Sequence, residues 1–188
     1  MIIAGIDIET TGLKQDEGHR IIEIAAQLWK FESLNDCKCV GQWTKRINPK
    51  RPIDPEAQRV HGISFEELSM EPTWEVVAKD LQRLLSHTDI LVAHNGEDFD
   101  IPFISMEMVR IGMAPPPIQV IDTMKQARWA TFNGKLPRLE ELCYATGVPY
   151  ERDKAHAAMY DVDVMMKAFF AALRKGFFTL PGQLKEAA

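Results

Sequence analysis

The sequence has 188 residues, of which 46% are hydrophobic, and a formal net charge of −5. This length and apolar content suit one compact domain with a buried core and are short for two, so we predict a single domain over residues 1–188. The acidic balance argues against a protein that coats a long duplex, because such proteins contact many phosphates with Lys and Arg.

Neither a secretory signal nor a membrane span is expected. The first apolar stretch contains Asp7 and Glu9 and lacks a basic leader. No apolar run approaches the ~18 residues that a membrane-spanning helix requires. The cysteines show neither a paired framework nor CxxC spacing, which is typical of reduced thiols. These features predict a cytoplasmic location and no contact with a membrane.

The first half of the chain begins with three apolar runs of strand length, at residues 2–8, 21–31 and 39–47. No helical pattern separates them, so they are expected to form an antiparallel meander. Helices are expected next, at residues 55–60 and 73–86. Between these helices, Ser64 and Glu67 have the spacing of a capping box around a short turn.

The second half of the chain alternates strands with helices. The expected elements, in chain order, are a strand at 89–93, a helix at 101–111, a strand at 118–121, and helices at 123–130, 136–146 and 157–175. Asp122 is the expected N-cap of the helix at 123–130, and Gly147 and Gly176 follow the last two helices as C-terminal signals. A meander followed by this alternation predicts an α/β fold with a mixed central sheet flanked by helices.

Two carboxylates interrupt the first strand. Asp7 and Glu9 are two residues apart, so their side chains point to the same face of an otherwise apolar element. One interpretation is that both lie at a frayed, solvated strand end. The other is that a divalent cation neutralises them, because Mg²⁺ and Mn²⁺ prefer hard oxygen ligands.

A polar loop directly follows the strand at 89–93. Residues 94–100, HNGEDFD, lead from this strand into a helix, at the place where loop carboxylates can face a cleft at the strand ends. In isolation, such a loop is more often a turn in which Asp98 or Asp100 caps the helix.

The last helix carries one acid on its apolar side. Asp161 shares a face with Ala158, Met165 and Phe169, so its charge requires a partner. His156 lies five residues earlier and is expected to reach the same cleft from the preceding loop. A lone histidine at this position would more often be a surface or capping residue.

These three segments together resemble one known family. The patterns DIETTG at residues 7–12, HN-xxx-FD at 94–100 and H-xxxx-D at 156–161 are similar, in order and distance, to the three exonuclease motifs of the DEDDh superfamily. This superfamily includes the proofreading epsilon subunit of bacterial DNA polymerase III and ribonuclease T. Further similar stretches are residues 47–64, 120–128 and 136–143. The likeness covers roughly residues 2–173.

The resemblance implies a ribonuclease H-like fold and a 3′→5′ exonuclease with a two-metal-ion mechanism. Asp7, Glu9, Asp100 and Asp161 would surround two Mg²⁺ or Mn²⁺ ions, with Asp7 as the bridge between them. Glu9 and Asp161 would complete the ligands of one ion, and Asp100 would hold the other. His156 would be the general base that accepts a proton from the attacking water.

The third carboxylate departs from the family pattern. Most members have two residues between the Asn and the Phe-Asp pair, whereas this chain has three, at 96–98. Asp100 is the expected ligand because Phe99 and Asp100 keep the apolar frame of the following helix. Asp98 remains the alternative.

The resemblance also implies contacts with the substrate. Leu13 would wedge against the terminal base and Thr10 would donate to the 3′ hydroxyl, with Thr11 beside them; ordinary turn packing is the alternative interpretation for these residues. Asn95 is expected to brace its loop rather than to touch metal. Further candidates for the substrate cleft are His61, Asn95 and Phe99. Independently of the resemblance, bound cations would meet the phosphate charge with help from local basic groups such as Lys45, Arg46, Lys50 and Arg51.

Nucleic acid is the expected partner, and DNA is preferred over RNA. Removal of nucleoside monophosphates from single-stranded or frayed 3′ ends of DNA is the first hypothesis, and RNA trimming is the second. An inactive nucleic-acid-binding module on the same fold, or a structural protein with capped carboxylates, would have no reason to match three ordered motifs. Association with a polymerase and self-association both stay open. Phe177 and Phe178, in the tail at 177–188, would pack on the domain or on another chain.

Overall fold

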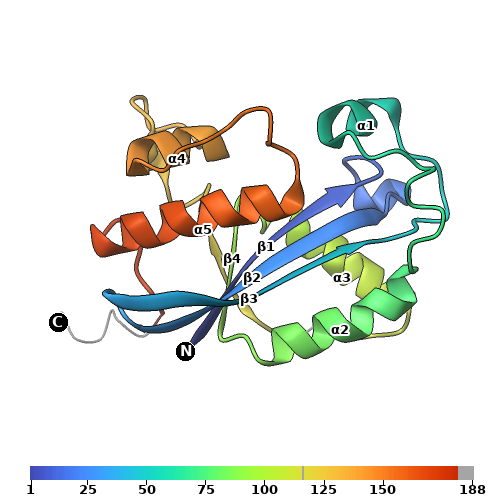
Figure 1. Ribbon diagram of the computed structural model, residues 1–188, viewed down its shortest axis with the longest axis horizontal. Helices are drawn as coiled ribbons and strands as arrows, with labels where there is room; N and C mark the ends of the chain where they lie inside the picture. Colours follow the sequence, from blue (N-terminus) through green and yellow to red (C-terminus); the bar gives the residue numbers. More distant parts are fainter. Residues whose placement is uncertain (116, 182–188) are drawn as a thin grey trace.

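The fold is organised around one five-stranded sheet, seen in the computed structural model, which describes residues 1–115 and 117–181 (Figure 1). The strands lie in the order β3-β2-β1-β4-β5. Their bounds are β1 Ile2–Thr10, β2 Ile21–Ser33, β3 Asp36–Arg46, β4 Ile90–Ala93 and β5 Gln119–Asp122. Strands β1, β2 and β3 form antiparallel pairs, whereas β4 runs parallel to both β1 and β5. The predicted mixed sheet with an antiparallel meander is confirmed.

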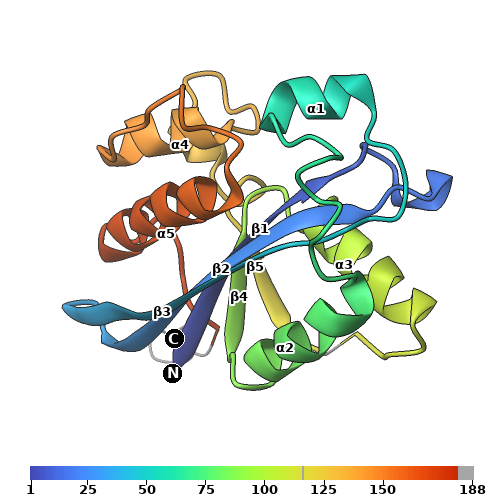
Figure 2. The same ribbon diagram turned by 45° about the vertical axis from the view of Figure 1, so that its right-hand side comes forward.

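Helices cover both faces of this sheet. The helical elements are η1 Gln15–Glu17, α1 Pro55–His61, α2 Trp74–Ser86, α3 Asp100–Arg110, η2 Arg128–Ala130, α4 Leu139–Thr146 and α5 Ala158–Arg174. Helices α4 and α5 lie on one side of the sheet, and α2 and α3 lie on the other, as the two views agree (Figures 1 and 2). Helix α1 stands beyond the C-terminal end of β1, apart from both layers.

Strand β1 serves both hydrophobic layers by alternation. Ala4, Ile6 and Ile8 pack in the cluster with α2 and α3. Ile3 packs in the cluster with α5, on the opposite face of the sheet. Since side chains alternate along a strand, Asp7 and Glu9 project on the α5 side, beyond the apolar part of β1.

Gly5 allows α5 to cross β1 at short range. A Cβ atom built on Gly5 would lie 2.5 Å from Cγ and 2.6 Å from Sδ of Met166. Only glycine leaves space for this approach. The crossing brings the first turn of α5, which contains Asp161, toward the C-terminal end of β1.

Most of the expected helices and strands are present, but the helix at 123–130 is wrong. That segment consists of turns followed by the short η2. Asp122 does accept the backbone N–H groups of Met124 and Lys125, at 2.9 and 3.0 Å, but no α-helix follows it. Its carboxylate also binds N–H groups of another loop, which makes it a tertiary anchor rather than a helix cap. The helix expected from residue 136 begins at Leu139.

The chain after α5 returns to the domain. Phe178 is buried in the α5-side cluster, and Phe177 stacks on Trp129 with ring centroids 4.3 Å apart. The remainder of the tail, residues 182–188, lies outside the described residues. Across the described residues, no helix combines the length and apolarity needed to span a bilayer. The three cysteines Cys37, Cys39 and Cys143 are free thiols.

Candidate active site

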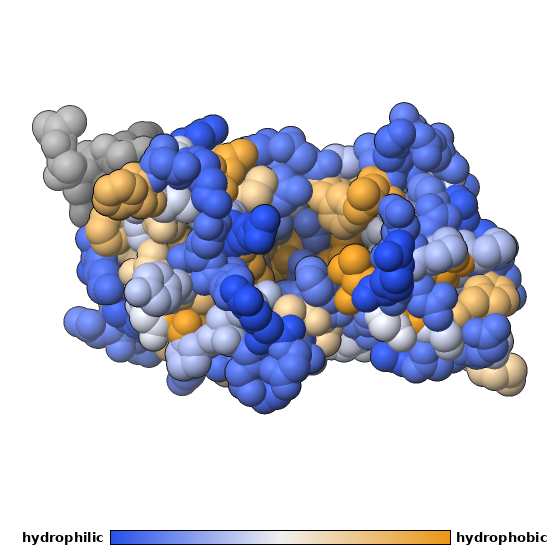
Figure 3. All heavy atoms as spheres, turned by 90° about the horizontal axis from the view of Figure 1, so that it is seen from above, coloured by the Kyte–Doolittle hydropathy of each residue, from blue (hydrophilic) through white to orange (hydrophobic). Residues whose placement is uncertain are grey.

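Four carboxylates and a histidine line one cleft. Asp7 and Glu9 come from the end of β1, Asp100 is the first residue of α3, and Asp161 lies in the first turn of α5. His156, in the loop before α5, lines the same cleft, whose volume is about 500 Å³. Seen from above, this face is hollowed near its middle, with apolar atoms in the recess and hydrophilic side chains around it (Figure 3).

The sheet topology explains why these segments meet. Strands β1 and β4 are parallel neighbours, so their C-terminal ends lie at the same edge of the sheet. The loop after β4 leads directly into α3 and thereby delivers Asp100 beside the end of β1. The first turn of α5 covers that edge from the opposite layer, and α1 provides the facing wall through residues such as Val60 and His61.

The loop at 94–98 is held in place by hydrogen bonds of the side chains of Asp122 and His94. The buried carboxylate of Asp122 accepts the N–H groups of Asn95 and Glu97, at 3.2 and 3.1 Å. His94 bonds through Nδ1 to the hydroxyl of Thr123 at 3.0 Å and through Nε2 to the carbonyl of Pro137 at 3.1 Å. Burial lowers the pKa of His94 to about 4, so the ring is neutral at pH 7. These bonds position the start of α3.

The structure separates the two candidates for the third carboxylate. Asp100 is 2% exposed and lines the cleft. Asp98 has a 64% exposed side chain that forms an ion pair with Lys125 at 2.7 Å. The extra residue in this loop is therefore absorbed by an exposed turn, and the geometry favours Asp100.

Asp161 and His156 are linked through the backbone. The N–H of His156 donates to Asp161 Oδ2 at 2.8 Å. His156 has a φ of 63°, a left-handed conformation that is uncommon for a non-glycine residue. In this conformation, ligand atoms of Glu9, His156 and Asp161 lie within 4.8 Å of one another.

The acidic groups of the cleft resist ionisation. Burial raises the pKa of Asp7 well above its usual value, and the charges of Asp100 and Glu9 raise it further. Burial raises the pKa of Glu9 to about 9, with Asp161 and Glu23 adding to the shift. For Asp100, burial raises the pKa to about 7. Burial also raises the pKa of Asp161. Such groups need protons or cations to share one pocket.

The cleft offers oxygen atoms that the protein itself does not satisfy. Asp100 Oδ1 and Asp161 Oδ1 are both buried without a hydrogen-bond partner among the described residues. Buried oxygens normally have partners, so unpaired ones in an acidic pocket indicate a missing ligand. Carboxylate oxygens are the donors that Mg²⁺ and Mn²⁺ prefer. The residues present therefore fit divalent cations.

Glu23 is a further acid beside the site that sequence reasoning missed. It lies opposite Glu9 in the β1–β2 pairing and is 8% exposed. Its carboxylate is satisfied by Arg46 Nε at 3.1 Å and by the N–H of Ala158 at 3.2 Å, so it ties β2 to the start of α5. Only the strand register could have revealed it.

The structure brings most of the expected substrate contacts to the cleft. The expected residues that line it are Thr10, Leu13, His61, Asn95 and Phe99. Leu13 is 78% exposed, and the hydroxyl of Thr10 donates to the carbonyl of Gly12 at 2.7 Å. Burial lowers the pKa of His61, which lies in the wall formed by α1.

Other expected contacts are not brought to the cleft. Thr11 is fully buried and does not line it. The basic residues expected to assist do not line it either; among the described residues, the basic side chain that does so is Lys14. Three histidines line the cleft besides His156. Only His61 was named as a candidate from the sequence; His94 begins the HN-xxx-FD motif but was given no role, and His19 lies in no motif.

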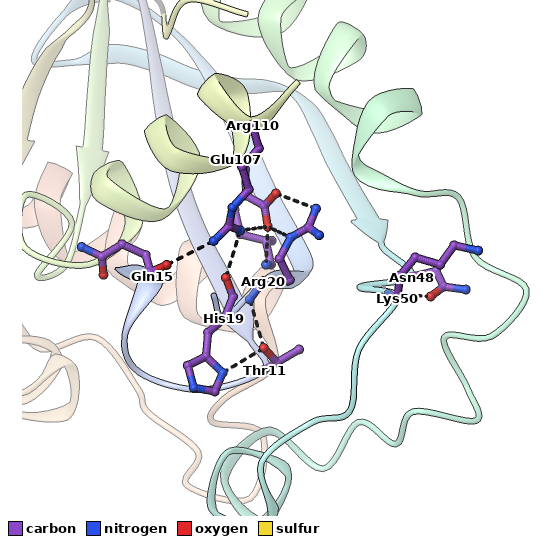
Figure 4. A network of polar contacts seen from close by, with 9 residues as sticks. Thr11, Gln15, His19, Arg20, Asn48, Lys50, Glu107 and Arg110 are labelled. Atoms are coloured by element: carbon purple, nitrogen blue, oxygen red, sulfur yellow. Dashed lines mark hydrogen bonds and ion pairs between the residues drawn. The ribbon is translucent and has the colours of Figure 1, made fainter. Parts of the chain in front are cut away.

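The loop that carries Leu13 is held by a buried polar network (Figure 4). The hydroxyl of Thr11 accepts the N–H of Arg20 at 3.0 Å and contacts Nδ1 of His19 at 3.1 Å. Arg20 forms a bidentate pair with the 1% exposed Glu107 of α3, at 2.6 and 2.8 Å. Arg110, also from α3, donates to the carbonyl of His19 at 3.2 Å. The network joins the loop after β1 to the helix that begins with Asp100.

Comparison with known families agrees with this geometry. A model of the exonuclease family of the RNase T type matches residues 4–169. The chain belongs to this exonuclease family. The three motifs that the sequence shares with DEDDh exonucleases lie within the matched range, so the predicted family is confirmed.

Relatives of this exonuclease family member include subunits of DNA polymerase III. DNA polymerase III subunit epsilon of Pasteurella multocida is 31% identical over 171 residues, which cover 87% of this chain and 65% of the relative. Subunit epsilon of Escherichia coli is 32% identical over 174 residues, which cover 88% of this chain and 69% of the relative. This chain thus spans less than two thirds of the Pasteurella protein.

A solved structure shares the fold. The zinc-bound complex of E. coli ExoI with single-stranded DNA superposes with a TM-score of 0.78 at 19% identity, covering 93% of this chain and 40% of that chain. This likeness confirms the predicted ribonuclease H-like fold. Family membership and the acidic cleft together indicate an enzyme rather than a binding or structural protein.

Proposed function

We propose that this protein is a 3′→5′ exonuclease that hydrolyses the terminal phosphodiester bond of a DNA strand and releases nucleoside monophosphates. The observation that carries this proposal is the convergence of Asp7, Glu9, Asp100, Asp161 and His156 on one cleft. A module that only binds nucleic acid would gain nothing from unpaired carboxylates facing a phosphate, because like charges repel. One exonuclease domain over residues 1–188, located in the cytoplasm, is the simplest form of this proposal.

The carboxylates are proposed to hold two divalent cations, Mg²⁺ or Mn²⁺. Asp7 lines the cleft near the C-terminal end of β1 and would bridge the two; Glu9 and Asp161 would hold one ion and Asp100 the other. When bound, such ions neutralise the phosphate charge, polarise the phosphorus and favour ionisation of water. The unpaired oxygens of Asp100 and Asp161 support this assignment.

His156 is the proposed general base. It lies at the exposed mouth of the cleft, where water and the phosphodiester both have access. The hydrogen bond from its backbone N–H to Asp161 fixes the position of the residue but leaves the imidazole nitrogens free of the bond. The ring can therefore take a proton from the attacking water and pass it to solvent.

Cleft residues on the α1 side would hold the terminal nucleotide. Leu13 projects from the loop after β1 and would wedge against the last base. Thr10 and His61 line the cleft beside it. Because the hydroxyl of Thr10 already donates to Gly12, Thr10 would accept a hydrogen bond from the 3′ hydroxyl rather than donate one. Asn95 and Phe99 complete the wall below.

DNA is the proposed substrate because the relatives are subunits of a DNA polymerase and the ExoI structure is a complex with single-stranded DNA. The polymerase subunits also make association with a polymerase the first partner to test. RNA trimming is a second candidate, since the matching family model carries the RNase T name.

The test is incubation of the purified protein with 5′-labelled single-stranded DNA, duplex DNA and RNA, each with Mg²⁺, Mn²⁺ or EDTA. We expect a ladder of shortened DNA products that depends on the added cation and is absent in Asp7→Ala. Cleavage that persists in EDTA or in Asp7→Ala would contradict the proposal. A ladder obtained from RNA alone would transfer the activity to the second candidate.

A further inference from the structure

Two hollows extend from the active-site cleft toward α4. The hollow beside the carboxylates is lined by Asp7, His156 and Asp161, and also by Arg138, Tyr150 and Arg152. A second hollow, further along α4, shares Arg138, Tyr150 and Arg152 with the first hollow, together with the acidic Glu140. The two hollows therefore adjoin along these shared residues, and together they form a groove that extends from the acidic site to the outer surface of α4.

Aromatic rings gather at the outer end of this groove. Phe132 is fully exposed and Tyr144 is 89% exposed, and both line the second hollow together with Tyr150. The ring of Tyr150 is fixed against Tyr160, with centroids 5.8 Å apart. Large rings exposed beside one groove can stack with nucleic-acid bases irrespective of the base sequence.

The groove is also more basic than the molecule as a whole. Arg138 forms no ion pair with any described residue. Arg152 pairs with Glu140 at 2.6 Å, and Lys135 pairs with Glu141 at 2.7 Å. In both pairs the cationic side chain is exposed to solvent. Exposed ion pairs are weak, so a phosphate can replace either carboxylate. In the second hollow the cationic side chains Lys135, Arg138 and Arg152 thus outnumber the carboxylates of Glu140 and Glu141, in a protein of net charge −5, although the charge of Arg138 also acts on Glu141.

We propose that this α4 groove, defined by Phe132, Lys135, Arg138, Tyr144, Tyr150 and Arg152, binds the single strand upstream of the terminal nucleotide. Phosphates would contact Arg138 and Arg152, and bases would stack on Phe132 and Tyr144. The inference rests on the proposed exonuclease function for its direction, because the strand must enter the acidic site by its end. The α4 groove is the part of the surface that a long strand reaches and a short strand does not.

The test compares substrate lengths. For the wild type, we expect a higher kcat/KM on the oligonucleotide dT12 than on the dinucleotide dT2, because only the longer strand reaches the second hollow. In Phe132→Ala/Tyr144→Ala and in Arg138→Ala, this preference should fall by about tenfold, because the first variant removes base stacking and the second removes a phosphate-binding group. The matched controls are Met70→Ala and Arg83→Ala, which change an exposed apolar and an exposed basic side chain outside both hollows.

Binding provides a readout that does not need turnover. Fluorescence anisotropy of 5′-labelled dT12 is measured with the full chain in an Asp7→Asn background, so that the strand is not degraded. We expect the Kd to rise about tenfold in the groove variants and to stay the same in the controls. Groove variants that bind dT12 with the same Kd as the Asp7→Asn parent would overturn the proposal, including the case in which the groove holds a partner protein instead. If the wild type degrades neither substrate but the groove variants still lose affinity for dT12, the exonuclease proposal fails while the groove assignment holds.

Discussion

At the scale of single residues, the site depends on which carboxylate of the 94–100 loop faces the cleft. Asp100 is buried with an unpaired oxygen, whereas Asp98 points to solvent and pairs with Lys125. We expect Asp100→Asn to lower kcat at least about a hundredfold, since loss of even an outer-shell partner of a metal ligand costs 10- to 100-fold. Asp98→Asn is the matched variant and should retain nearly full activity, because it breaks only an exposed pair. Steady-state hydrolysis of a DNA oligonucleotide measures both, and the reverse order would move the third ligand to Asp98.

His156 allows a second test at this scale. We expect His156→Ala to lower kcat by roughly 10²–10⁴-fold, the usual contribution of a general base, with little change in cation affinity measured by calorimetry. His87, an exposed histidine just after α2 that does not line the cleft, is the control position for the same substitution. A large loss of cation affinity in His156→Ala would show that the ring is a metal ligand instead. Cation affinity is therefore measured as well, because His156 lies close to Glu9 and Asp161. An unchanged kcat would remove it from the mechanism.

At the scale of helices and strands, the crossing of α5 over β1 sets the distance between Asp161 and the acids of β1. We expect Gly5→Ala to destabilise the protein by roughly 1–3 kcal/mol, because the added methyl overlaps Met166 in a packed core. For a chain of this size, each kcal/mol lowers the Tm by roughly 2–4 °C. Gly41→Ala in β3, where the nearest atom lies 3.5 Å from the added carbon, is the matched control. Thermal unfolding followed by circular dichroism compares the two, and equal Tm values would contradict the close crossing.

The contact between α3 and the loop after β1 predicts a different kinetic effect. Glu107 accepts three hydrogen bonds from Arg20 and Ile21 and is 1% exposed. We expect Glu107→Gln to cost roughly 1.5–3 kcal/mol of stability, because it weakens hydrogen bonds with a charged partner. Since the loop carries Leu13, KM for DNA should rise more than kcat falls. Asp80→Asn, which breaks an exposed pair on α2, is the control. A fall in kcat at constant KM would argue against a role of the loop in holding substrate.

At the scale of the whole molecule, local sequence patterns predicted most helices and strands, whereas contacts that depend on how these elements pack together could not be predicted. The strand of Asp7 and Glu9 and the helix of Asp161 follow from alternation and helical periodicity, which are properties of short segments. Glu23 is acidic in an apolar strand, but only the β1–β2 register places it opposite Glu9. Asp122 resembled a helix cap because a cap and a tertiary anchor use the same carboxylate. Thr11 likewise points away from the cleft, because its hydroxyl forms hydrogen bonds with Arg20 and His19.

The concentration of acids also makes the stability of the whole molecule depend on pH and cations. Asp100 and Glu9 have folded-state pKa values of about 7 and about 9, above those of free carboxyls, so the folded state holds protons that the unfolded state has released. The free energy of unfolding should therefore fall as pH rises, up to about pH 7 through Asp100 and up to about pH 9 through Glu9. The contribution of Glu9 is best measured from about pH 7.5 to 9, where histidines of the unfolded chain no longer titrate. Added Mg²⁺ or Mn²⁺ replaces the protons, so the cation-induced rise in Tm should grow over the same range.

Asp7→Asn, which removes one of the crowded charges, should flatten the fall of Tm with pH in EDTA. Thermal unfolding at several pH values, with EDTA or with cation, measures both effects, and a Tm that rises with pH in EDTA would show that these carboxylates do not share a pocket.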